Sequence, residues 1–223
     1  MTAAGVIAVV VAGAALAVRY QPAATRMTLP SDGGVERAAA RMVSKVSAVA
    51  AAIERVGEWG EAIDDEEANA WLTRDLPRMT SGGLPSGWRS LAVRFHPGRV
   101  ACSGILGGGA AAARWWAILD VRLMRADELA ITVASAGLGL FPLPDGVVLA
   151  GLVRAANTLG WQGEIRLHDG RSRLHLLLPG RRDGARDAVG GYHLEGLRID
   201  EGELVFTGST HAGSPPRAPT RAP

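Results

Sequence analysis

Cysteine is nearly absent from this chain, in which Cys102 is the only one. A single cysteine excludes an intrachain disulfide and a zinc site built from several thiolates. Cys102 lies in a segment of strand-like alternation, which is typical of a small buried side chain and not of a reactive thiol. No thiol chemistry is therefore expected at this position.

Lysine is equally scarce, since Lys45 is the only one among 24 basic residues. The 22 acidic residues leave a formal net charge of +2. Nucleic-acid-binding domains usually carry a concentrated basic face, so nucleic acid is not an expected partner. Hydrophobic residues make up 48% of the chain, which is enough to form a packed core.

The sequence also lacks the common catalytic and metal-binding motifs. Its five histidines form no H-x-x-x-H pair, and no G-x-S-x-G motif of the serine hydrolases occurs. The glycine-rich residues 104–109 precede an expected strand where a phosphate-binding loop needs a helix, so they predict a hairpin. His168 and His175 could approach each other beside Asp169, but solvent-facing strand histidines are expected. The sequence thus predicts no catalytic, cofactor-binding or metal-binding residue and favours a non-enzymatic protein.

Residues 3–18 form an uncharged apolar segment near the N-terminus. As a helix it would span about 24 Å, against about 30 Å for the hydrocarbon core of a bilayer. We expect residues 1–20 to be a single-pass membrane anchor with an interfacial edge at Arg19 and Tyr20. Two alternatives stay open: a signal peptide cleaved after the small-x-small residues 15–17, and a buried soluble helix.

The side of the membrane is weakly marked. Arg19 and Arg26 follow the apolar segment, so the positive-inside rule alone would place the domain in the cytoplasm.

The remaining chain divides into three parts by composition. Residues 21–33 contain proline and glycine and predict a linker. Residues 34–207 predict a single α+β domain, and residues 208–223, rich in Ser, Thr, Pro, Gly and Arg, predict a disordered tail.

A long amphipathic helix is expected over residues 35–58. Its apolar positions recur at alternating spacings of four and three residues: Val35, Ala39, Met42, Val46, Val49, Ile53 and Val56. Small side chains on this stripe, packed against a sheet, could leave an apolar groove lined by Met42, Val46, Val49 and Ile53. The alternative is that the same residues fill a dry core.

A second helix is expected to begin after Asp64. Asp64 and Glu67 match the spacing of a capping box, with Asp in place of Ser or Thr. Asn69 lies on the same face as Leu72 and Leu76, so it is expected to point inward and bond backbone. We interpret Asp64, Glu67 and Asn69 as a structural motif.

About eight short strands follow, with apolar and polar residues in alternation. Such strands predict a curved antiparallel meander sheet with one covered face. One short helix, at residues 145–159, interrupts them. Turns are expected at residues 97–98, 126–127, 169–170 and 201–202.

Several short motifs resemble a family of bacterial membrane-anchored proteins of unknown activity, of a type found in planctomycetes. They are E-A-N-A-W-L at residues 67–72, D-L-P at 75–77, P-G-R-V at 97–100, G-L-F-P-L-P at 139–144 and D-E-G-E-L at 200–204. The resemblance covers roughly residues 35–208 and implies an extracytoplasmic domain in the cell envelope. More remotely, the helix-then-meander order is similar to the half-modules of TULIP-type lipid-binding proteins, an analogy of fold alone.

These observations lead to an expected function. The chain is expected to be a membrane-anchored envelope protein that binds lipid or another apolar ligand, with no cofactor. The alternative is a structural or protein-interaction domain with a dry core and an unknown envelope protein as its partner.

Overall fold

The computed structural model describes residues 17, 19–26, 32–79, 88–109, 112–158, 161–178 and 189–212. Within these residues the chain is α+β, as the sequence predicted. The elements, in chain order, are η1 (Ala23–Thr25), α2 (Asp32–Ile53), β1 (Gly57–Asp64), α3 (Asp65–Arg74), α4 (Leu76–Met79), β2 (Trp88–His96), β3 (Arg99–Leu106), β4 (Ala113–Arg125), β5 (Glu128–Leu138), β6 (Phe141–Pro142), α5 (Asp145–Thr158), β7 (Gln162–His168), β8 (Arg171–Leu177), β9 (Val189–Asp200) and β10 (Glu203–Ala212).

The expected membrane anchor lies outside the described residues except for Ala17, Arg19 and Tyr20. Among the helices of the described ranges, none has both the length and the hydropathy that a membrane crossing requires. The anchor therefore stays a prediction.

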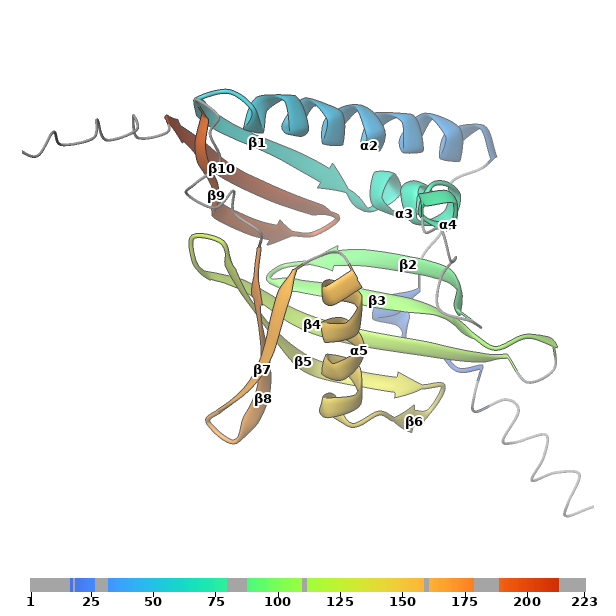
Figure 1. Ribbon diagram of the computed structural model, residues 1–223. Helices are drawn as coiled ribbons and strands as arrows, with labels where there is room; N and C mark the ends of the chain where they lie inside the picture. The colour runs from blue at the N-terminus through green and yellow to red at the C-terminus, as the bar shows by residue number, and fades with distance from the viewer. Residues whose placement is uncertain are drawn as a thin grey trace, which may run out of the picture.

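The strands form two antiparallel sheets where the sequence predicted one curved meander. The smaller sheet has the order β1-β10-β9, and the larger has the order β2-β3-β4-β5-β8-β7, with β6 paired to β5. Figure 1 shows α2 along the top of the molecule above the smaller sheet, the larger sheet below it, and α5 lying across the larger sheet. The last hairpin, β9–β10, is thus not part of the larger sheet. Its strand β10 pairs with β1 in the smaller sheet.

Strand β1 was missed by the sequence analysis, which extended the first helix to residue 58. The helix ends at Ile53, and Val56 beyond it is 60% exposed. Gly57 has φ +144°, a conformation that side-chain-bearing residues rarely adopt, and the chain turns there into β1. Val56 fits the helical spacing but is largely exposed, so the spacing predicted a helix longer than the one that forms.

The main core lies between α5 and the larger sheet. Leu149 of α5 and Leu174 of β8 are completely buried, and Leu119, Val133 and Leu176 pack with them. This helix matches the predicted one at residues 145–159. Cys102 packs at the edge of the same cluster, and burial raises the pKa of its thiol to about 12, in agreement with an unreactive side chain.

Helix α3 joins the two sheets by covering the open edge of β2. Asn69 donates to the carbonyl of Val93 and accepts from its N–H, both at 2.7 Å. Asp65 Oδ1 accepts from the N–H of Phe95 at 2.7 Å. Side chains of α3 therefore bond the backbone groups that an edge strand would otherwise leave unpaired.

Both ends of the described chain contain more structure than expected. Residues 21–26, predicted as linker, lie on the larger sheet, where Thr25 is completely buried and its carbonyl accepts from Ser103 Oγ at 3.3 Å. Strand β10 continues through Ala212, so the prediction of a disordered tail was wrong for residues 208–212. The tail from residue 213 onward lies outside the described residues.

Candidate anion-binding site

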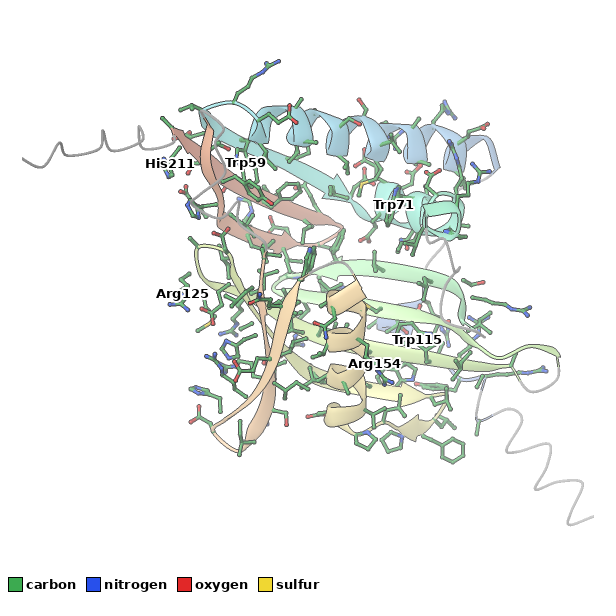
Figure 2. The ribbon with its side chains drawn as sticks, in the orientation of Figure 1. Trp59, Trp71, Trp115, Arg125, Arg154 and His211 are labelled. Carbon is green, nitrogen blue, oxygen red and sulfur yellow. The ribbon has the colours of Figure 1, made fainter. Side chains whose placement is uncertain are left out.

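The larger sheet has one face covered by α5 and one polar face that is open over β4, β5, β8 and β7. Leu174 and Leu176 pack against α5, so Arg173 and His175, which alternate with them along β8, point to the opposite face. Figure 2 shows Arg125, at the end of β4, and Arg154, on α5, on opposite sides of β7 and β8. The strand register places many charged side chains together on the open face.

The open face contains a cavity of about 420 Å³. Its lining residues come from β4, β5 and the β7–β8 hairpin: Asp120, Arg122, Met124, Ala130, Thr132, His168, Asp169, Arg171 and Arg173. The register explains the gathering, because Arg122 pairs with Ala130, Asp120 with Thr132, and Thr132 with Arg173. We call this cavity the arginine cavity.

Each of the two acidic residues in the described lining of the arginine cavity has a basic side chain beside it. Asp120 Oδ1 accepts from Arg99 Nε at 2.8 Å. Asp169 Oδ2 lies 3.2 Å from His168 Nε2, an ion pair whenever the histidine is protonated. Asp120 is therefore neutralised by Arg99, whereas Asp169 is neutralised by His168 only when that histidine is protonated.

The side chains of Arg122, Arg171 and Arg173 form no hydrogen bond and no ion pair with any residue that the structure describes. A guanidinium group has five N–H donors in a planar fork and stays charged at any physiological pH. Three such groups around one cavity leave an excess of positive charge and unused donors. The arrangement suits a bound oxyanion.

A second, smaller cavity of about 120 Å³ lies on the same face, beside Glu128. Glu128 is 7% exposed and receives a hydrogen bond of 2.8 Å from His175 Nδ1 and another from Arg125. The bond from His175 is the largest influence and lowers the pKa of the Glu128 carboxyl, with Arg125 adding to the effect against the opposing effect of burial. Because its charges are already matched, we assign this cluster a structural role.

The three-stranded sheet has a shallow hollow of about 510 Å³ lined by Glu58, Trp59, Gly60, Glu195, Thr207 and Gly208. Among the described residues, its lining contains two carboxylates and no cation. The nearby Ser209 is 7% exposed, and its hydroxyl donates to Glu195 Oε1 at 2.6 Å while lying 3.3 Å from His211 Nε2. A serine proton held by Glu195 is not available to His211, so this cluster does not form an activated nucleophile.

The sequence-predicted motif of Asp64, Glu67 and Asn69 lies away from both cavities. Asp64 and Glu67 form the complete capping box of α3. Asn69 forms hydrogen bonds with backbone groups, as predicted. Its partner is Val93 at the edge of β2. The motif holds α3 in place, which agrees with the structural interpretation.

Glu67 also joins α3 to α2. It is 1% exposed, and its carboxylate accepts from Lys45 Nζ at 2.7 Å and from Arg41 Nε at 3.1 Å. Burial opposes its ionisation, but hydrogen bonds from Lys45, the Asp64 N–H and Arg41 outweigh burial and lower the pKa of Glu67. The spacing of Asp64 and Glu67 predicts the helix cap. It does not predict the two cationic partners of Glu67 on the preceding helix.

The four residues predicted to line an apolar groove do not share one environment. Met42 packs into the cluster of Ile63, Phe95 and Ile199 between the sheets, and Val49 and Ile53 are half-buried. Val46, however, is 49% exposed. Helix α2 packs against α3 and β1 through Ala38 and Ala39, and Val46 lies largely in solvent. The apolar groove therefore stays a prediction.

The arginine cavity was missed from the sequence. A local signal existed, since Arg122 alternates with apolar neighbours on β4 and Arg173 does the same on β8. Alternation shows that both arginine side chains point away from the core. It does not show that only β5 lies between β4 and β8. That proximity comes from the pairing of β5 with β8 across the inserted α5.

Together these features define an α+β domain of two antiparallel sheets with an arginine-rich cavity on an open sheet face. No protein family matches the chain, and no curated protein or solved structure matches it either. The resemblances to membrane-anchored bacterial proteins and to TULIP half-modules therefore stay expectations.

Proposed function

We propose that this chain is a non-enzymatic binding domain that holds an oxyanion group, such as a phosphate, sulfate or carboxylate, in the arginine cavity. The observation that carries the proposal is the group of three arginines around a cavity of about 420 Å³, none of which has a side-chain partner among the described residues. Oxyanions match the guanidinium fork in geometry and charge, and such bonds are stronger than those between neutral groups. Small-ligand sites typically have volumes of roughly 300–1,000 Å³, so the cavity can take a phosphorylated small molecule.

Binding suits this cavity better than proton-transfer catalysis does. Guanidinium groups hold and orient anions but do not exchange protons at ordinary pH. Asp120 is engaged by Arg99 and Asp169 by His168. The chemistry supported by the described side chains is therefore recognition of charge.

The proposal includes attachment to the cell membrane through residues 3–18, with the domain outside the cytoplasm. Its support is the uncharged apolar character of that segment. An apolar groove along α2 stays a prediction with less support, because Val46 is exposed. The exposed Val43 and Val46, at 45% and 49%, instead favour the alternative of a protein partner at α2.

Thermal unfolding tests the proposal. The full chain in a non-ionic detergent would be heated in sodium phosphate, sodium sulfate and sodium chloride at equal ionic strength. A ligand that binds only the folded state raises the Tm, so phosphate or sulfate should raise it above the chloride value. Both anions also stabilise folded proteins in general, so the triple variant Arg122→Gln, Arg171→Gln, Arg173→Gln should lose only the part of the rise that comes from site binding.

A matched variant controls for net charge. Arg37→Gln, Arg55→Gln and Arg78→Gln remove the same three charges from exposed positions outside the sheet. This control should keep the oxyanion-dependent rise in Tm. An equal rise in all three proteins, or none in the wild type, would count against the arginine cavity.

A further inference from the structure

We propose that the turn from β5 to β6, with the beginning of α5, rests in the headgroup layer of a lipid membrane. Four large apolar side chains in this region are exposed: Tyr20 by 43%, Leu140 by 58%, Phe141 by 53% and Val147 by 56%. We call these four residues the apolar rim. Exposed apolar groups that cluster in this way mark interaction surfaces more often than isolated ones do.

The N-terminal apolar segment meets the fold at this rim. The Leu140 N–H donates to the Ala17 carbonyl at 2.8 Å, and the Tyr20 N–H lies 3.3 Å from the same oxygen. Residues 3–16, which precede Ala17, carry no charge. If that segment is a membrane anchor, Leu140 and Phe141 enter the interfacial layer with it.

The charges beside the rim are two arginines and one carboxylate, Asp145 in the first turn of α5, so positive charge is in excess. Arg19 and Arg114 are both exposed, and the Arg114 carbonyl accepts from the Gly139 N–H, next to Leu140. Arg114 Nη1 also donates to Gln21 Oε1 at 2.9 Å, which holds its side chain near the incoming chain. Aromatic and leucine side chains flanked by arginines are the usual composition of a membrane-interface contact.

The position of the apolar segment favours lipid over other occupants. A second copy or a partner protein would explain an exposed rim, but neither would explain why an uncharged segment joins the fold at the same place. This inference rests on the proposed membrane attachment of residues 3–18. It does not depend on anion binding, because the rim contains no residue of the arginine cavity.

Site-specific fluorescence in vesicles tests the proposal. The background is the full chain with Cys102→Ala, and an environment-sensitive dye is attached at Leu140→Cys. The matched control carries the dye at Leu167→Cys, which is 76% exposed near the β7–β8 turn. Vesicles would contain phosphatidylcholine with a minority of phosphatidylglycerol, and flotation would first establish whether the chain associates with them.

The proposal expects the dye at 140 to shift to shorter wavelength and to be quenched by brominated lipid, whereas the dye at 167 stays open to aqueous iodide. Equal access of iodide to both sites would overturn the rim contact while leaving attachment intact. Shielding at 140 without quenching by brominated lipid would mean that protein, not lipid, covers the rim. A chain that does not float with vesicles would overturn the attachment on which the inference rests.

Discussion

Glu67 is a buried carboxylate whose two cationic neighbours lie on a different helix. Lys45 contributes most directly, since its ammonium group bonds both Glu67 Oε2 and the carbonyl of Ala62. A buried charge is tolerated only when its bonding capacity is satisfied. The single lysine of the chain therefore ties α2 to α3 and to β1.

Removing the ammonium group should destabilise the fold. Lys45→Met keeps the aliphatic stem but leaves Glu67 with Arg41 and the helix N-terminus, and we expect a loss of about 2–4 kcal/mol. Arg37→Met is the control, because Arg37 lies on the same helix with an exposed side chain and should change stability by less than about 0.5 kcal/mol. Urea unfolding of the three proteins measures both effects. Equal stability of the two variants would contradict the role given to Lys45.

The lowered pKa of Glu67 predicts a pH dependence of known sign. A carboxyl whose pKa is lower in the folded state than its usual value of about 4.3 stabilises the fold fully above that value. This contribution is lost as the pH falls through the lowered folded-state pKa. Glu67→Gln should thus be less stable than the wild type at pH 7, by about 1–3 kcal/mol.

The difference between Glu67→Gln and the wild type should shrink as the pH falls below about 4, because the wild-type carboxyl is then also neutral. Unfolding by urea at a series of pH values measures it. A difference that stays constant from neutral to acid pH would show that the charge of Glu67 is not what stabilises the fold.

At the scale of elements, α3 connects the two sheets, together with direct backbone hydrogen bonds such as that from Gly98 to Ile199. Its side chains bond the β2 edge at Val93 and Phe95, through Asn69 and Asp65 respectively. These are separate bonds to separate amides. Each can therefore be removed without removing the other.

Hydrogen exchange can resolve the two bonds. In Asn69→Ala the amide of Val93 loses its acceptor and should exchange faster, while the amide of Phe95 stays protected by Asp65. The total stability should fall by about 1–3 kcal/mol, since buried backbone groups lose a partner. Asn157→Ala, at an exposed position of α5, is the control. Uniform acceleration of both amides in Asn69→Ala would mean that the edge opens as one unit.

The sequence predicted those elements whose signals are local. The capping box at Asp64 depends on residues three apart, and the turn at Asp169-Gly170 depends on two neighbours that adopt positive φ. Strand β1 was missed because Val56 continues the helical spacing beyond Ile53. Its pairing with β10 links parts of the chain far apart in sequence, which no local pattern records.

At the scale of the whole molecule, the candidate site follows from strand order. Polar alternation in β4, β7 and β8 predicted a solvent-facing side for each strand. Only the pairing of β5 with both β4 and β8 brings Arg122, Arg171 and Arg173 around one cavity. The sequence thus shows that arginines lie on the polar side of these strands. It does not show which residues lie next to them in the fold.

A calorimetric titration of inorganic pyrophosphate into the full chain tests anion binding in the arginine cavity most directly. Our account predicts saturable binding to one site per chain, lost in Arg122→Gln, Arg171→Gln, Arg173→Gln and retained in Arg37→Gln, Arg55→Gln, Arg78→Gln. Binding should also weaken as sodium chloride is raised, since the contacts are ionic. No saturable heat in the wild type, or the same affinity in both triple variants, would contradict it.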